Sequence, residues 1–251
     1  MEKEEYKVMY DIEDNYWWYA GLRKLVLASI DRFACKEGKL RILDAGCGTG
    51  RILESCKEYN ACGIDLSDEA IKFCKTRSLG NIIQSTICDI PFQNNSFDVV
   101  ISLDVLYHAN VNNDLTALNE FYRVTNKDGI VILNLPAYNF LKSRHDVAIH
   151  TKHRYTYMDL KKKIEKAGFR IERLTYRNII LFPLVFIKRM IEKLFVVNNE
   201  KTESDLKLLP EVVNKFLTKL LFIENRLILS GLNFPFGLSL YCIAKKTKSS
   251  F

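Results

Sequence analysis

The most informative stretch of this 251-residue sequence is Leu43-Asp44-Ala45-Gly46-Cys47-Gly48-Thr49-Gly50. It follows the apolar, strand-like run Leu40–Leu43 and precedes a segment with helical spacing from Arg51 to Tyr59. Glycine permits a tight turn and lets a ligand lie directly against the backbone, where a Cβ would block it. In an open parallel sheet, ligands bind beyond the carboxyl ends of the strands, and this first strand-to-helix turn lies there. The stretch therefore predicts a nucleotide-type binding turn.

The spacing of the glycines indicates which ligand the turn takes. They fall at positions 46, 48 and 50, just after the acidic residue Asp44. A dinucleotide fingerprint reads Gly-x-Gly-x-x-Gly and a phosphate-binding loop ends in Gly-Lys-Ser/Thr, so neither pattern fits. Asp65 ends the second predicted strand, where its carboxylate can accept hydrogen bonds from two ribose hydroxyls. Asp89 follows the third strand, placed to accept from an adenine amino group while Ile90 packs on the ring.

Apolar and β-branched runs alternate with amphipathic segments from residue 40 to about residue 135. This pattern is typical of βαβ units that feed a parallel sheet. We therefore predict an α/β, doubly wound fold with a mostly parallel seven-stranded sheet. The expected strands are 40–43, 61–64, 82–86, 97–101, 129–133, 169–174 and 238–244, and the expected helices are 51–59, 67–77, 114–124, 157–167, 179–197 and 206–229.

The composition is that of an ordinary globular protein, with 48% hydrophobic and 27% charged residues. The charged start, residues 1–5, leads into no apolar run, so no secretory signal is expected and a cytoplasmic location is the default. The seven cysteines form no Cys-x-x-Cys pair, which predicts reduced thiols without disulfides or zinc. The net charge of +7 is interpreted as solvated helix faces and tails, although it would also favour an anionic partner.

Five stretches, in order, resemble the class I S-adenosylmethionine-dependent methyltransferase family, and in particular its type 11-like subgroup. They are Ile42–Gly50, Gly63–Ser67, Cys88–Phe92, Phe97–His108 and Ala167–Phe169, and the resemblance covers residues 40–175. It implies a Rossmann-like fold and S-adenosylmethionine as the cofactor. It also implies that the glycine turn contacts the methionine part, Asp65 the ribose, Asp89 and Ile90 the adenine, and the strand end near Leu103 the methionine amino group. The expected cofactor-binding residues are Trp17, Arg23, Asp44, Ala45, Gly46, Cys47, Gly48, Gly50, Asp65, Leu66, Asp89, Ile90 and Leu103.

The first forty residues contain the aromatic run Tyr16–Tyr19, followed by Gly21 and Arg23. A similar Trp-Trp-Tyr followed by glycine and arginine opens the same subgroup, where the segment is expected to fold over the cofactor. Many members carry two consecutive arginines, whereas Leu22 replaces the first one here. We therefore predict a helical lid over residues 1–38 in which Arg23 pairs with the cofactor carboxylate. A helix packed on the core is the more common use of such an aromatic stripe.

The remaining residues divide into a cofactor-binding core, 39–177 with 237–246, and a predicted helical insert over 178–236. The insert takes some sixty residues where a hairpin turn would suffice, so it is predicted to form part of the substrate wall or an interaction surface. Charged residues interrupt both of its apolar runs, which makes a membrane span unconvincing. Residues 178–198 could still contact a membrane surface. Alternatively, these helices cover one another or a partner in a homodimer.

All four histidines follow predicted strands: His108 after the fourth, and His145, His150 and His153 in the loop after the fifth. Residues 150–156 read His-Thr-Lys-His-Arg-Tyr-Thr, similar to a His-x-x-His-Arg-Arg-Tyr-Thr stretch of the subgroup with one arginine missing. His150 and His153 are therefore the predicted catalytic residues, as bases or substrate-positioning groups, and helix capping is the alternative. His108 is interpreted as structural. No metal is expected, because the spacing matches no common zinc pattern.

The expected reaction is methylation of oxygen or nitrogen in a small molecule or in a glycan or lipid precursor. The sulfonium is already activated, so the protein mainly has to align the nucleophile and exclude water. A nucleic-acid acceptor is not expected, because Ser102–Val105 stands where an Asn/Asp-Pro-Pro-Tyr/Phe motif would follow the fourth strand, and no RNA-binding module is appended. The alternatives are an RNA or protein methyltransferase, and a cofactor-binding regulator without catalysis.

Overall fold

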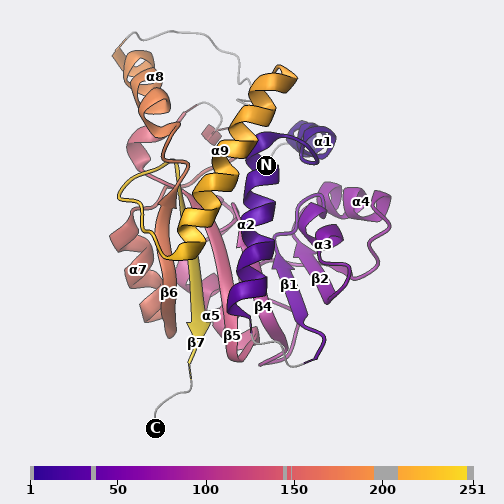
Figure 1. The fold of residues 1–251 in the computed structure, drawn as a ribbon. Coiled ribbons are helices and arrows are strands. Elements are labelled where there is room, and N and C mark those ends of the chain that lie inside the picture. Colours follow the sequence, from indigo (N-terminus) through magenta and orange to yellow (C-terminus); the bar gives the residue numbers. More distant parts are fainter. Residues whose placement is uncertain (1–2, 35–37, 144–145, 148, 195–208, 248–251) are drawn as a thin grey trace.

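One seven-stranded sheet runs through the computed structural model, which describes residues 3–34, 38–143, 146–147, 149–194 and 209–247 (Figure 1). The strand order is β3-β2-β1-β4-β5-β7-β6, and β7 runs antiparallel to β5 and β6 while the other neighbours pair in parallel. The order reverses between β1 and β4, so a ligand crevice is expected at the carboxyl ends of these two strands. The strands are β1 (Arg41–Ala45), β2 (Asn60–Asp65), β3 (Ile82–Gln84), β4 (Phe97–Leu103), β5 (Thr125–Pro136), β6 (Phe169–Arg177) and β7 (Ser239–Lys246).

Helices cover both faces of the sheet, with α2 and α9 on one face and α5 and α7 on the other (Figure 1). This arrangement confirms the predicted α/β, doubly wound fold and its mostly parallel sheet. The described helices are α1 (Lys3–Ile12), α2 (Trp17–Phe33), α3 (Arg51–Ser55), α4 (Asp68–Thr76), α5 (Asp114–Val124), α7 (Tyr157–Lys166), α8 (Phe182–Leu194) and α9 (Glu211–Ser230), with a short 3-10 turn η1 (Asn139–Leu141).

Successive residues of β1 face the two helical layers. Ile42 is buried in a cluster with Leu25 of α2 and Ile228 of α9. Leu43 is buried in a second cluster with Phe121 of α5 and Ile164 of α7. Because both faces are covered, the central strands are apolar throughout, as expected for buried parallel strands. The glycine turn at the end of β1 is thereby anchored from both sides.

The helix α9 packs against the N-terminal helix α2 and closes one layer of the fold. Asn225 donates to the backbone carbonyl of Gly21 through Nδ2 at 2.8 Å. The two helices lie so close that a Cβ at Gly21 would stand 2.4 Å from Cδ1 of Leu221. This half of the predicted insert therefore covers the sheet and α2. None of the described helices is long and apolar enough to cross a membrane.

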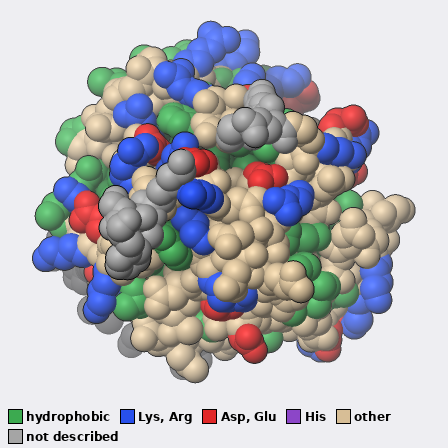
Figure 2. All heavy atoms as spheres, turned by 90° about the horizontal axis from the view of Figure 1, so that it is seen from below, with side chains coloured by type: hydrophobic (Ala, Val, Ile, Leu, Met, Phe, Trp, Pro, Cys, Tyr) green, Lys and Arg blue, Asp and Glu red, His purple; other side chains and the backbone are tan. Residues whose placement is uncertain are grey.

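Figure 2 shows the end of the molecule at which the parallel strands begin, opposite their carboxyl ends. Basic and acidic side chains stand beside one another on this face. Two ion pairs are examples: Arg41 with Asp98 at 3.5 Å, and Lys245 with Asp128 at 3.3 Å. The basic charge in this view is therefore interspersed with acidic charge, as expected of a solvated surface.

Candidate active site

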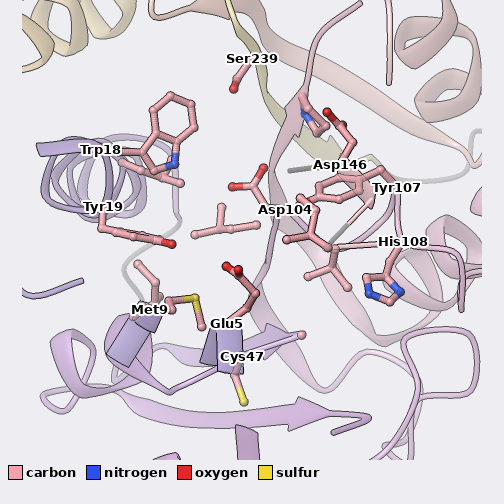
Figure 3. Close-up of a pocket in the computed structure, with 18 of the residues that line it drawn as sticks. Glu5, Met9, Trp18, Tyr19, Cys47, Asp104, Tyr107, His108, Asp146 and Ser239 are labelled. Atoms are coloured by element: carbon pink, nitrogen blue, oxygen red, sulfur yellow. The ribbon is translucent and has the colours of Figure 1, made fainter. Parts of the chain in front are cut away.

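A cavity of about 750 Å³ opens at the carboxyl ends of the strands, next to the point where the strand order reverses (Figure 3). Its size lies within the ~300–1,000 Å³ typical of small-molecule pockets. The glycine turn, the ends of β2, β4 and β5, the N-terminal helices and α8 all contribute to its wall. The cavity is the candidate site, with one end at the glycine turn and the other at the start of α8.

At Gly46 the backbone of the turn lies against Val105, another residue of the cavity wall. Its φ is 88°, in the left-handed region that favours glycine, and a Cβ there would lie 2.3 Å from Cγ2 of Val105. The amides of Gly46 and Cys47 both donate to the carbonyl of Ile64, at 2.8 and 3.0 Å. The turn is therefore held to the end of β2, and neither steric room nor backbone geometry permits a side chain at position 46.

Asp65, the last residue of β2, connects the glycine turn to the start of α4. Its Oδ2 accepts from the amide of Gly48 at 2.9 Å, and its Oδ1 accepts from the amide of Ser67 at 2.9 Å. Each carboxylate oxygen retains a second lone pair. Because Asp65 lines the cavity, those lone pairs are available to hydroxyl donors of a ligand.

Asp44 is buried at the end of β1 beside the same turn. Burial raises the pKa of Asp44 to about 8, with further contributions from the nearby carboxylates of Asp65 and Glu13. A cation placed at this end of the cavity would offset the burial and favour the ionised form of Asp44. The turn therefore suits a ligand with a positively charged group.

The N-terminal helices are fastened to the core by a cluster that we call the lid clasp: Glu13, Thr49 and Arg77. Arg77 donates to Oε1 of Glu13 at 2.9 Å and to the carbonyl of Thr49 at 3.1 Å. The Thr49 hydroxyl also donates to Glu13. Glu13 and Arg77 are almost fully buried, at 6% and 7% side-chain exposure. The clasp thus joins the loop between α1 and α2 to the glycine turn.

Replacing Arg77 by methionine is expected to lower the free energy of unfolding by about 3–5 kcal/mol, because it leaves the Glu13 carboxylate buried without its cation. Urea denaturation of the purified chain measures this. The matched control is Arg170→Met, which removes an exposed ion pair with Glu172 and is expected to cost less than about 1 kcal/mol. Equal losses in the two variants would show that the clasp does not hold the lid.

Asp104 occupies the middle of the cavity wall, between Tyr19 and Tyr107 (Figure 3). It follows β4 with a φ of 57°, a strained conformation for a residue other than glycine. Asn134 donates through Nδ2 to both carboxylate oxygens, at 3.1 and 3.0 Å. Burial raises the pKa of Asp104 to about 6 in spite of these bonds. A carboxylate of this kind is ionised at neutral pH yet basic enough to accept a proton.

Comparison with known proteins identifies the cofactor half of this site. The family model described as a methyltransferase domain matches residues 43–133. Residues 43–133 are a methyltransferase domain. The match runs from the glycine turn through Asp65 and Asp104 to β5, and it confirms both the resemblance drawn from the sequence and S-adenosylmethionine as the cofactor. The predicted Trp-Trp-Tyr segment of the subgroup is present at the start of α2.

Curated relatives of this methyltransferase domain differ in what their names record. An uncharacterized protein of Methanocaldococcus jannaschii is 35% identical over 92 residues, which cover 37% of this chain and 39% of the relative. The tRNA (carboxymethyluridine(34)-5-O)-methyltransferase of Xenopus tropicalis is 30% identical over 96 residues, which cover 37% of this chain and 15% of the relative. This chain thus spans less than half the length of these relatives. The second name runs against the expectation that nucleic acid is not an acceptor.

A solved structure of the complex that contains the Haloferax volcanii Trm112 methyltransferase activator has a chain with the same fold. The TM-score is 0.61 at 16% identity, over 97% of this chain and 94% of that one. Identity this low shows the fold alone. It nevertheless extends the likeness beyond residues 43–133, to the N-terminal helices and to the strands after β5.

Nine of the thirteen predicted cofactor residues line the cavity of the methyltransferase domain. They are Trp17, Arg23, Asp44, Gly46, Cys47, Gly48, Asp65, Leu66 and Leu103. Ala45 and Gly50 belong to the turn but do not line the cavity. Arg23 donates to the carbonyls of Glu13 and Asp14 at 2.9 and 2.8 Å, so it fastens the lid loop. Its pairing with the cofactor carboxylate stays a prediction.

Asp89 and Ile90 do not line the cavity, and their contact with the adenine stays a prediction. β3 ends at Gln84, and the residues at its carboxyl end that do line the cavity are Ser85, Thr86 and Ile87. Asp89 is exposed. Ile90 is buried, and its amide donates to Oε2 of Glu120 at 2.8 Å. The residues of this loop that line the cavity therefore begin at Ser85, four residues before Asp89.

His150 and His153 also lie outside the cavity wall, and their role as catalytic residues stays a prediction. His153 Nε2 is 3.1 Å from Oδ2 of Asp114, at the start of α5, and the His153 ring lies 4.4 Å from that of Tyr155. His150 is exposed, with its ring 5.7 Å from that of His108. His153 thus joins a packing network around Asp114. His145 lies outside the described residues.

His108, interpreted from the sequence as structural, lines the cavity, which neither of the other two described histidines does (Figure 3). Burial lowers the pKa of His108 to about 4, so its imidazole is neutral at neutral pH. Sequence reasoning also missed Asp104 as a site residue. The available signal was an aspartate close to the carboxyl end of the fourth strand, as Asp65 is to that of the second.

Replacing His153 by glutamine is expected to leave kcat within about threefold of wild type, because the ring faces Asp114 and not the cavity. Loss of a general base costs about 10²–10⁴ in rate. Initial-rate assays of methyl transfer at saturating cofactor measure the difference. A loss of 100-fold or more in kcat, with the fold intact by circular dichroism, would identify His153 as the base.

Proposed function

We propose that this protein transfers the methyl group of S-adenosylmethionine to an oxygen or nitrogen atom of an acceptor that binds beside Asp104. The observation that carries the proposal is one cavity that joins the glycine turn and Asp65 to the buried carboxylate of Asp104. The glycine turn and Asp65 suit an adenosine ligand with a sulfonium. The Asp104 carboxylate suits removal of a proton from the group that receives the methyl.

The orientation of the cofactor follows from the donors and acceptors along the wall. In the proposal, the ribose hydroxyls donate to Asp65, and the adenine packs against Thr86 and Ile87. The methionine part lies along Gly46 and reaches the end of β4 near Leu103. This orientation directs the sulfonium toward the middle of the cavity, where Asp104 stands.

S-adenosylmethionine supplies an activated methyl group, so the protein has three tasks. Asp104 accepts the proton of an acceptor O–H or N–H as the acceptor attacks the methyl carbon in line with the departing sulfur. Asn134 holds the Asp104 carboxylate in place through its amide. Trp18 and Tyr19 of the lid exclude water from the reacting groups. The products are S-adenosylhomocysteine and the methylated acceptor.

A small molecule, or the head of a glycan or lipid precursor, is the acceptor that the cavity favours. The acceptor end is enclosed by the lid residue Trp18 and by Leu181 and Val185 at the start of α8. These residues lie outside 43–133, so the family match carries no information about the acceptor. An RNA nucleotide is the second candidate, and the tRNA methyltransferases among the relatives are the observation that favours it.

The experiment is incubation of the purified chain with radiolabelled S-adenosylmethionine and, separately, with cell metabolites, lipid extract and small RNA. Label in a metabolite or lipid fraction supports the first acceptor class, and nuclease-sensitive label in RNA supports the second. Cofactor binding without transfer to any fraction would leave a cofactor-binding regulator and refute the enzyme. Asp104→Asn run in parallel separates catalysed transfer from chemical methylation.

Contact of the insert with a membrane surface or a second copy remains a prediction. Leu184, Ile187 and Ile191 are about half exposed or more, and they recur at helical spacing along α8. Residues 195–198 of the predicted contact segment lie outside the described residues. Flotation with liposomes tests the membrane contact, and sedimentation tests the dimer. The cytoplasmic location also stays a prediction.

A further inference from the structure

Arg177, at the end of β6, is a fully buried arginine in which two of the three guanidinium nitrogens have no hydrogen-bond partner among the described residues. Its Nη1 donates to Oδ1 of Asn134 at 3.4 Å. Among the residues that the structure describes, no acceptor lies within hydrogen-bond distance of its Nε or Nη2. Buried polar groups in proteins are nearly always satisfied, and those that are not call for an explanation. The unused donors therefore indicate a missing partner.

The two unused nitrogens form one edge of the guanidinium plane. An Nε–H and an Nη2–H point the same way and match the two oxygens of a carboxylate. The opposite corner, Nη1, is fixed by Asn134, which also holds Asp104. The edge is therefore set at a defined position relative to the proposed base.

Arg177 lies next to residues that line the acceptor end of the cavity. Arg177 is paired in register with Ser239, and its guanidinium carbon is 4.9 Å from the centre of the Trp18 ring. Ser239, Trp18 and Asp104 all line the cavity and surround its acceptor end in Figure 3. The next residue in the chain, Asn178, lines it as well. Arg177 itself does not line the cavity, so a ligand would reach its guanidinium only when the Trp18 ring shifts.

Asn178 adds a second unused donor. It is 1% exposed, and among the described residues no acceptor contacts its Nδ2. Its φ of 62° is held by Glu224 of α9, whose Oε1 accepts from the Asn178 amide and whose Oε2 accepts from the amide of Ile179 at 3.0 Å. The side-chain amide is thus presented by a built turn, not by a loose loop.

Basic residues also lie at this end of the cavity. Lys188 and Arg189 of α8 line it. The cation Arg154 is matched by Asp146, at 2.8 Å for each of two bonds. The carboxylates whose charge favours the protonated form of Arg177 are Glu224 and Asp104.

We propose that the methyl acceptor carries a carboxylate, and that the Nε and Nη2 edge of Arg177 and the side-chain amide of Asn178 bind it. The carboxylate is a recognition group, and the hydroxyl or amine that is methylated lies on the same molecule beside Asp104. The methylation step in this inference rests on the proposed function, whereas the binding test does not depend on it. It makes Arg177 and Asn178 determinants of acceptor specificity.

Phenylacetate is a suitable probe, since its ring fits the apolar side chains of Leu181 and Val185. The full chain is saturated with S-adenosylhomocysteine, so that the part of the site that takes the cofactor's own carboxylate is filled. Titration calorimetry then compares phenylacetate with phenylacetamide and phenylphosphonate. We expect phenylacetate to bind at least about tenfold more tightly than the amide, because hydrogen bonds to a charged group are the stronger ones.

Two variants test the residues. Arg177→Lys keeps the charge but loses the bidentate edge, and it is expected to weaken phenylacetate about 10–100-fold without changing S-adenosylhomocysteine affinity. Asn178→Gly tolerates the positive φ and removes the amide, with a smaller loss of up to about tenfold. The matched control is Arg173→Lys on the same strand, whose Nη1 donates to the carbonyl of Gly231, and it should bind phenylacetate as wild type does.

The inference fails if phenylacetate and phenylacetamide bind equally, if phenylphosphonate binds tenfold more tightly than phenylacetate, or if neither variant weakens phenylacetate. Should Arg177→Lys not fold, Asn178→Gly alone decides. The binding test requires no methyl transfer. If the wild-type chain transfers methyl groups but does not bind phenylacetate, this inference alone is rejected. Binding of phenylacetate by a chain that transfers no methyl group rejects the proposed function alone.

Discussion

Replacing Asp104 by asparagine is expected to lower kcat for methyl transfer by about 10²–10⁴ while the Kd for S-adenosylmethionine stays within about threefold. The asparagine preserves the shape of the side chain and can still bond Asn134, so the fold and the cofactor site should persist. The variant cannot accept the proton of the methyl acceptor. Single-turnover transfer from labelled cofactor measures the chemical step.

The control for this variant is Asp98→Asn. Asp98 lies on the same strand at its opposite end, where it accepts from the amide of Arg41 at 2.8 Å. We expect kcat within about twofold of wild type for this control. A similar loss in both variants, or no loss in Asp104→Asn, would contradict the role of Asp104 as the base.

The pH dependence of the wild-type rate provides an independent check of the same residue. Burial raises the pKa of Asp104 to about 6, so the carboxylate is mostly ionised above pH 6 and protonated below it. Because only the ionised form accepts a proton, kcat should fall about tenfold per pH unit below pH 6 and level off above pH 7. The Asp104→Asn variant should lack this inflection.

Replacing Gly46 by alanine is expected to raise the Kd for S-adenosylmethionine at least about 100-fold, which corresponds to about 2.7 kcal/mol. The new Cβ would lie 2.3 Å from Cγ2 of Val105, and the φ of 88° is unfavourable for alanine. The turn must therefore move away from the position that accommodates the cofactor. Overpacking and left-handed strain should also lower the free energy of unfolding by about 2–5 kcal/mol.

Gly80→Ala is the matched control, because a Cβ there meets no atom within 4 Å and the backbone is not left-handed. Its cofactor affinity should equal that of wild type. The double variant Gly46→Ala with Val105→Ala removes the steric clash but not the backbone strain, so it should recover stability only in part. Wild-type affinity in Gly46→Ala would mean that the ligand does not approach this turn.

The fold could be predicted from the sequence because its signals are local. Strand-like runs, amphipathic spacing and the glycine turn each depend on neighbouring residues, and the predicted strands match the observed ones to within a few residues. The largest difference is β5, which begins at Thr125 and not at Gly129. Its first residues are polar and continue directly from α5, so no apolar pattern marks where the strand begins.

The cofactor half of the site was predictable for the same reason, although the residues expected at the adenine differ from those that line the cavity. The sequence singled out Asp89 within Cys88–Phe92, whereas β3 had already ended at Gln84. Distance from the strand end, not residue type, decides which side chain reaches the cavity. Counting from the strand end would have indicated Ser85 to Ile87.

The acceptor end was not predictable from local pattern, because its residues meet only in the folded chain. Three of these residues come from different strands: Asp104 follows β4, Asn134 lies on β5 and Arg177 ends β6. Trp18 lies on the helix α2. The sequence places the histidines near the right edge of the sheet but cannot show which way they face. His153 faces Asp114, and His108 faces the cavity.

The most direct test of the proposed cofactor orientation is a crystal structure of the full chain with S-adenosylhomocysteine. We expect ribose hydroxyls within hydrogen-bond distance of Asp65, adenine against Thr86 and Ile87, and the sulfur on the side of the cavity that faces Asp104. Adenine stacked at Asp89 and Ile90, or a sulfur turned away from Asp104, would contradict it.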